Sequence, residues 1–178
     1  MWLSGVCFLF AQESNTGSHN LNIVFPEVAL LDIESEDGSD INFIIENQDL
    51  AAGEEFEIHE QNEALWLNYT SLVAQNGATR AISVHSTSVL EIPGLDISIE
   101  ALSHSGVGGG SLGSPTSVVV PSTTATNIIT GIGSAFTGDG VTNGHKLVYS
   151  LDYTGSTENL HAMNGDIATI SIVYTITD

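Results

Sequence analysis

Lysine and arginine are almost absent from this sequence. Arg80 and Lys146 are the only basic residues, against 22 acidic residues in a chain of 178, and the formal net charge is −20. Proteins that bind polyanions depend on lysine and arginine, which displace the counterions that surround phosphate groups. A chain of this charge is repelled by such partners. We therefore expect neither nucleic acid nor a bare anionic lipid surface as a partner.

Cysteine is limited to Cys7, which lies in an apolar, uncharged stretch of residues 1–11. A polar stretch, residues 12–19, follows it, and this order is typical of the end of a secretory signal peptide. The stretch is too short for a transmembrane helix, which needs about 20 apolar residues. We predict that residues 1–11 are a signal-peptide remnant with cleavage near Ala11, and that the secreted chain contains no cysteine and no disulfide. The alternative is that these residues form an apolar first strand.

Helical periodicity is also lacking, whereas stretches that alternate apolar and polar residues recur between clusters of Gly, Asn, Asp, Ser and Pro. The alternation is clearest near the C-terminus, where four apolar side chains share one face: Ile170, Ile172, Tyr174 and Ile176. The predicted strands are 21–25, 28–33, 41–46, 54–59, 64–70, 80–85, 95–102, 116–120, 146–153 and 168–177.

About ten short strands without crossover helices predict an all-β fold, an antiparallel β-sandwich of the Ig-like or pilin-like kind. We expect residues 12–178 to form a single domain. Its composition is uneven, since 14 of the 22 acidic residues lie between Glu13 and Glu63, and 12 of the 18 glycines lie between Gly106 and Gly165. The glycine-rich stretch near 103–115 predicts a surface loop, a usual place for binding sites.

The sequence contains short matches to catalytic motifs, but the residues around them do not fit the structures that these motifs require. Ser111 lies between Gly109 and Gly113 as in a nucleophile elbow, but Pro115 and a β-rich stretch follow where that motif requires a helix. The six histidines lack the short spacings typical of zinc sites, although ligands in a β-fold can converge from distant strands. We therefore expect a protein that is not an enzyme.

An acidic cluster suggests calcium as the candidate cofactor, because carboxylate oxygens at alternate positions suit this hard cation. The EF-hand register is broken, since Gly38 comes one place late and Phe43 occupies the position of the bidentate glutamate. The alternative is a solvated acidic turn between strands. The candidate ligands are Asp32, Glu34, Glu36, Asp37 and Asp40.

Trp66 and Tyr69 could form a platform on which a sugar ring stacks, with loops at 103–115 and 130–145 completing a glycan site. The stretch from Leu65 to Thr70 is also typical of a core strand, and in that interpretation Trp66 is buried.

Several features together resemble secreted bacterial surface sandwiches. They are the signal remnant, the cysteine-free β chain, the stretch from Trp66 to Thr70, the glycine-rich stretch from Thr130 to Gly138, and the alternating strand that ends in VYTITD at Asp178. The sequence resembles pilin-like and spore-coat-U-like subunits in pattern, and more distantly the WxL-type wall-binding domains. The resemblance implies an extracellular, structural role.

We expect a secreted, extracellular or cell-surface protein that is a surface, adhesive or filament-forming structural subunit. Its expected partners are further copies of itself or other surface proteins. The predicted assembly strand carries Ile170, Ile172, Tyr174 and Ile176, because a long, uncharged, alternating strand can add to the edge of a neighbouring sheet. The alternative is a carbohydrate- or calcium-dependent binding module, with a glycan as its ligand.

Overall fold

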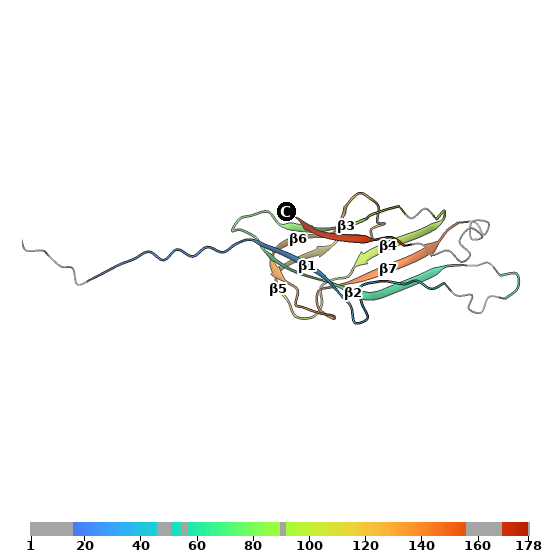
Figure 1. The fold of residues 1–178 in the computed structure, drawn as a ribbon, viewed down its shortest axis with the longest axis horizontal. Helices are drawn as coiled ribbons and strands as arrows, with labels where there is room; N and C mark the ends of the chain where they lie inside the picture. The colour runs from blue at the N-terminus through green and yellow to red at the C-terminus, as the bar shows by residue number, and fades with distance from the viewer. Residues whose placement is uncertain (1–15, 46–50, 55–56, 90–91, 156–168, 178) are drawn as a thin grey trace, which may run out of the picture.

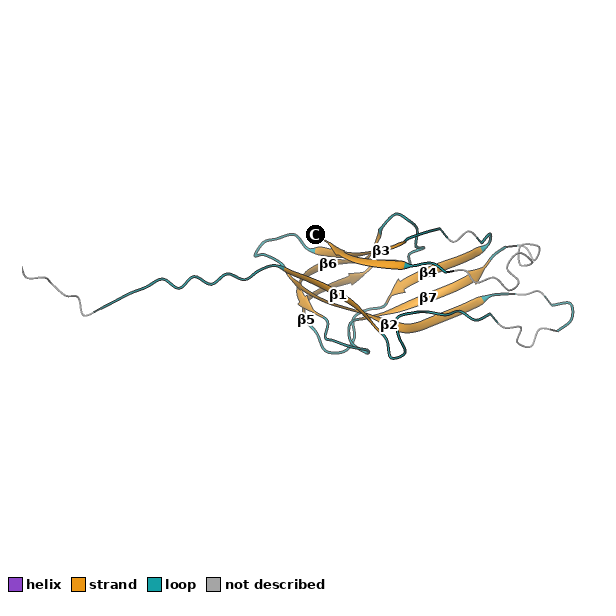
Figure 2. Ribbon diagram, in the orientation of Figure 1, coloured by secondary structure: helices purple, strands orange, loops and turns teal. Residues whose placement is uncertain are grey.

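The computed structural model describes residues 16–45, 51–54, 57–89, 92–155 and 169–177, and these residues contain strands and no helix. One antiparallel sheet has eight strands (Figures 1 and 2). They are β1 (Val28–Glu34), β2 (His59–Leu72), β3 (Arg80–Ser86), β4 (Leu95–Ala101), β5 (Gly109–Pro115), β6 (Thr126–Phe136), β7 (His145–Tyr153) and β8 (Ile172–Thr177). The all-β, antiparallel prediction is confirmed, with eight strands in place of about ten.

The strand order along the sheet is β4-β7-β2-β6-β3-β8, while β1 pairs with β2 and β5 pairs with β6. The long strand β2 changes partner along its length. Its first part pairs with β7 from His59 to Leu67, and then Thr70 and Ser71 pair with Phe136 and Ala135 of β6. The strand β2 therefore joins the half of the sheet that holds β7 and β4 to the half that holds β6, β3 and β8.

A single cluster of buried apolar side chains draws its members from both halves of the sheet. Alternation on β2 turns Leu65, Leu67 and Tyr69 into this cluster, where each is less than 5% exposed. Burial of one such side chain contributes about 1.5–3 kcal/mol. Strands β3, β4, β6 and β7 contribute further members of the cluster: Ile82, Val84, Ile99, Ile128, Ile129, Ile132, Leu147 and Tyr149.

Six predicted strands, at 28–33, 64–70, 80–85, 95–102, 146–153 and 168–177, correspond to β1, β2, β3, β4, β7 and β8. Residues 21–25 and the described part of 41–46 are not strands, and the predicted strand 116–120 is reduced to one bridge between Val119 and Ile99. Part of the predicted strand 54–59 lies outside the described residues, and β2 begins at its last residue. The strand β6 was not predicted.

The predicted loop near 103–115 is wrong for its second half, because residues 109–115 form β5. The glycines serve close approach to β6. Gly110 and Gly113 adopt positive φ angles of 87° and 75°, and the register shifts between Gly110 and Leu112 as in a β-bulge. A Cβ atom at either position would collide with backbone oxygens of β6, those of Ser134 and Thr130 respectively. Here glycine content reflects tight strand packing.

The only arginine of the chain is buried at one end of this sheet. The Arg80 side chain is 5% exposed, and its guanidinium donates hydrogen bonds to the carbonyl oxygen of Val28, to the carbonyl oxygen of Leu72 at 3.2 Å and to Ser71 Oγ at 3.3 Å. It also forms an ion pair with Glu27 Oε2 at 3.1 Å. Arg80 thus fastens the start of β1 to the end of β2 and the start of β3.

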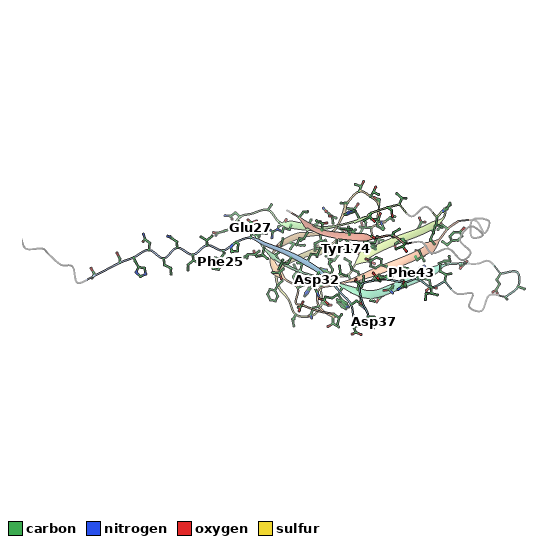
Figure 3. All side chains as sticks on the ribbon, viewed as in Figure 1. Phe25, Glu27, Asp32, Asp37, Phe43 and Tyr174 are labelled. Carbon is green, nitrogen blue, oxygen red and sulfur yellow. The ribbon has the colours of Figure 1, made fainter. Side chains whose placement is uncertain are left out.

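Residues 16–27 precede β1 as an extended segment that projects from the body of the molecule (Figure 1). We call residues 16–25 the arm. Its apolar side chains are in solvent: Leu21, Ile23, Val24 and Phe25 are 67–87% exposed. Figure 3 shows Phe25 on the arm, just beyond the point where Glu27 meets the body.

Replacing the buried arginine by a side chain of similar length tests this anchor. Arg80→Met removes the charged donor from two backbone carbonyls, and hydrogen bonds of a charged group are worth about 1.5–3 kcal/mol, so we expect the free energy of unfolding to fall by about that amount. Glu27→Gln breaks only a half-exposed ion pair, for which we expect about 1 kcal/mol or less. Urea denaturation of both variants measures the difference, and equal losses would contradict the anchor.

Candidate association surfaces and binding pocket

The predicted assembly strand lies at the end of the sheet. The strand β8 pairs with β3 in antiparallel register from Ala81↔Thr177 to Ser86↔Ile172. Three of its four named side chains, those of Ile172, Tyr174 and Ile176, are half-buried and pack against the core of their own chain. Ile170 precedes the strand and is also half-buried. These side chains therefore pack within their own chain, and the part of β8 that remains for a partner is its unpaired backbone edge.

Four strands, β1, β4, β5 and β8, each pair with a single strand of the described sheet. Within the described part of the chain, no strand pairs with the second edge of β8 or with the second edge of β1. The two strands run next to each other in Figure 1. Burial raises the pKa of Tyr174 well above its usual range, and its hydroxyl hydrogen-bonds that of Tyr149 at 2.7 Å, so this end of the sheet is tied to β7.

An apolar groove lies on the outward face where β1, β2, β6 and β5 meet. The register places Leu30 beside Thr70, Thr70 beside Phe136, and Phe136 beside Gly109. Leu30 and Phe136 are 63% and 54% exposed. The groove has a volume of about 390 Å³ and no charged lining residue; the lining is Val28, Thr70, Ser71, Leu72, Gly109, Gly110, Ser134, Ala135 and Phe136.

Figure 3 labels Glu27 just before β1 and Asp32 within it, and the arm continues directly into this strand, which borders the groove through Val28. The Phe136 ring lies across Gly109, since a Cβ atom there would be 3.2 Å from its Cε1. Glycine at 109 thus leaves the ring room to lie flat along the groove.

A second pocket, of about 280 Å³, lies beside Trp66. Trp66 faces outward and is half-buried, so the prediction that it is buried in the core is wrong, because alternation on β2 turns Leu65 and Leu67 inward instead. The same alternation places Trp66 and Tyr69 on opposite faces of β2, which excludes a joint stacking platform. Lys146 Nζ lies 5.5 Å from the centre of the Trp66 ring and 3.1 Å from Glu63 Oε2.

The rim of this pocket carries backbone strain. Thr142 has a φ of 70°, which is unfavourable for a β-branched residue. Such strain is concentrated at functional sites in proteins, where surrounding structure holds it. Two residues of the predicted calcium cluster, Glu36 and Asp37, line the same pocket as Thr142 and Trp66.

The rest of the acidic cluster is dispersed. Asp32 lies in β1, is exposed, and its Oδ1 accepts a hydrogen bond from the Ile33 amide at 2.8 Å. Glu34 ends the same strand and Asp40 lies in the following connection. Across the described ranges, no three His, Cys, Asp or Glu side chains come together as a metal site would require. Of the five predicted ligands, the structure therefore brings Glu36 and Asp37 to one pocket.

A buried polar cluster surrounds His145, the first residue of β7, and nothing in the sequence beyond the presence of histidine predicts it. His145 is 0% exposed, its Nδ1 lies 2.8 Å from the carbonyl oxygen of Leu102, and its Nε2 lies 3.2 Å from the hydroxyl of Tyr69. The Tyr69 hydroxyl also donates to the carbonyl oxygen of Leu112, and the His104 ring lies edge-on to that of His145. Each polar atom of the Tyr69 and His145 rings therefore lies within hydrogen-bonding distance of a partner inside the core.

Ser111 and the histidine–aspartate pair on the surface lie on different strands, β5 for the serine and β2 and β7 for the pair. Ser111 lies within β5, where the nucleophile-elbow motif would need a strand-to-helix turn. His59 Nδ1 and Asp152 Oδ1 are 2.5 Å apart on an exposed part of β2 and β7, and the aspartate raises the pKa of His59.

Comparisons with known proteins add no relative: no family model, no curated protein and no solved structure matches this chain. No helix long and apolar enough to cross a membrane occurs among the residues that the structure describes.

The buried histidine predicts a pH-dependent stability. Burial lowers the pKa of His145 below its ordinary 6.5, and nearby His104 acts in the same direction. Below pH 6.5 the unfolded chain therefore binds a proton at this position that the folded chain resists, so the stability contributed by neutral His145 is complete above pH 6.5 and is lost as the pH falls.

We expect the free energy of unfolding of the natural chain to fall from pH 7 to pH 5 more steeply than that of His145→Gln. Thermal or urea denaturation across this range measures the slopes. Parallel slopes for the two proteins would show that His145 does not titrate differently on folding.

Proposed function

We propose that this protein is a non-enzymatic structural subunit of an extracellular assembly, a surface, adhesive or filament-forming protein whose copies associate with one another. The single observation that carries the proposal is the arm, which holds four large apolar side chains 67–87% exposed to solvent outside the body of the fold. Exposed apolar surface of this kind marks sites of protein association.

The unpaired edges of β1 and β8 support the same proposal. An open strand edge presents backbone donors and acceptors that a strand of another chain can pair with. The net charge of −20 also supports the assembly proposal, since repulsion keeps free copies apart until specific contacts form.

We also propose that the two halves of the sheet pack face to face as a β-sandwich, as in the pilin-like and spore-coat-U-like subunits that the sequence resembles. The shared cluster supports this arrangement, because it joins Ile99 and Leu147 of β4 and β7 to Ile82 and Ile132 of β3 and β6. Secretion and the loss of residues 1–11 belong to the same proposal.

Association through the edge of β8 can be tested with one added charge. Thr175 is exposed near the middle of β8, so Thr175→Glu should leave the fold intact and place a charge where a neighbouring strand would pair. We expect at least tenfold weaker self-association in sedimentation equilibrium.

The matched control is Asn127→Glu, which adds the same charge to an exposed position of β6, a strand paired with both β3 and β5. Equal effects of the two substitutions would argue against the edge. A natural chain that stays strictly monomeric at high concentration, with and without calcium, in sedimentation and electron microscopy, would refute the assembly role.

A second candidate function is a carbohydrate- or calcium-dependent binding module. The observation that favours it is the pocket beside Trp66, which gathers an aromatic ring, the strained Thr142 and the carboxylates of Glu36, Asp37 and Glu63. Aromatic faces and carboxylates are groups that contact sugars through stacking and hydrogen bonds.

For this candidate we expect Trp66→Ala to abolish retention on a glycan array, with calcium or a chelator present in parallel arms. Val120→Ala, at an exposed position outside the pocket, should leave retention unchanged. The absence of any glycan or calcium binding by the natural chain in calorimetry would remove the candidate.

A further inference from the structure

We infer that the arm of one copy binds in the apolar groove of a second copy, with Leu21, Ile23 and Phe25 packed along the outward face formed by β1, β2, β6 and β5. This inference rests on the proposed assembly function and names the two surfaces that meet.

The arm has the side-chain pattern of a segment that binds along one face. In an extended chain, alternate residues point the same way, so Leu21, Ile23 and Phe25 form one apolar row. Phe25 precedes Pro26, and the residue before a proline favours the extended conformation. The stretch from Thr16 to Pro26 contains no Asp, Glu, Lys or Arg, in a chain region that otherwise carries most of the acidic residues.

The groove matches this row in chemistry and length. None of its lining residues is charged, so the arm can approach it without the desolvation of a carboxylate. Four neighbouring strands span about 15 Å from first to last, since strands lie about 4.8 Å apart. Residues 20–25 extend about 20 Å at about 3.3 Å per residue, which is enough to cross all four.

The groove offers room for side chains at defined places. Gly109 and Gly110 leave the β5 side of the groove without side chains, and the Phe136 ring borders it from β6. Val28 and Leu72 form the opposite side, where β1 and β2 pair. Because these apolar groups are partly exposed in the single copy, covering them with apolar arm residues removes both surfaces from water.

The arm of the same copy is poorly placed to fill this groove. Arg80 holds the Glu27 carboxylate and the Val28 carbonyl oxygen, and so fixes the chain where the arm begins. Figure 1 shows the arm extending away from the body from this point. A return to the groove would require the chain to reverse at Pro26 and Glu27, and Pro26 has a fixed φ while Glu27 is ion-paired. The occupant is therefore the arm of another copy.

Crosslinking between single-cysteine copies tests this inference directly. In a Cys7→Ser background, the Ile23→Cys chain is mixed with the Leu72→Cys chain and oxidised, and disulfide-linked peptides are identified by mass spectrometry. We expect a linked pair that joins position 23 of one chain to position 72 of the other. The matched control replaces Leu72→Cys with Val120→Cys, at a more exposed position outside the groove.

Equal yields with the groove and control positions would overturn the inference. So would a double variant that carries both cysteines and crosslinks only within one chain, because this outcome means that the arm folds back on its own groove.

Sedimentation equilibrium provides the quantitative test. Phe25→Ser changes a side chain that lies outside the fold, and we expect self-association to weaken about ten- to hundredfold, the effect of losing one buried aromatic side chain. Phe136→Ser should produce a similar loss, and the two substitutions together should cost little more than one, because they remove the two sides of one contact. Val120→Ser should change association less than twofold.

The results separate this inference from the function it rests on. If the natural chain associates and Phe25→Ser associates equally well, the arm is not the contact, while the assembly role stands. If the natural chain does not associate at any concentration, both fail.

Discussion

The buried guanidinium of Arg80 is the interaction on which the arrangement of this protein depends. It joins the start of β1, the end of β2 and the start of β3 through two carbonyl oxygens, a serine hydroxyl and the Glu27 carboxylate. A buried cation is normally costly, but here it is paired, hydrogen-bonded and placed in the field of a strongly acidic chain. Its effect reaches beyond stability, because it fixes the point at which the apolar arm leaves the body.

The surface of the molecule has acidic regions that repel other copies and apolar regions that can bind them. Most acidic residues precede Trp66 in the sequence, and those that the structure describes lie mainly in β1, in the connection that follows it, and in and just before the first half of β2. The arm and the groove between β1 and β5 carry no charge. Two copies that approach at random meet negative surfaces, whereas copies that approach with arm and groove aligned meet apolar ones. Charge and apolar surface together therefore favour one mode of contact over many.

Sequence reasoning located the strands whose residues alternate clearly. The last strand and the stretch from Leu65 to Thr70 were predicted correctly, because alternation reports which side chains share a face. It does not report the partner. Residues 21–25 alternate like a strand and are extended, yet no strand of the described chain pairs with them. The groove could not be predicted, since it depends on the register of Leu30, Thr70 and Phe136 across three strands. The strand β5 was missed because its glycines are typical of a loop.

The contact between the arm and the groove can be observed directly by nuclear magnetic resonance in a mixture of isotope-labelled and unlabelled copies. Isotope-filtered nuclear Overhauser spectra record only proximities between different copies. The account predicts cross-peaks from the methyl groups of Ile23 in the labelled copy to the methyl groups of Leu72 in the unlabelled copy. Associated copies that show no such cross-peaks, with the arm resonances unchanged from those of the free chain, would contradict it.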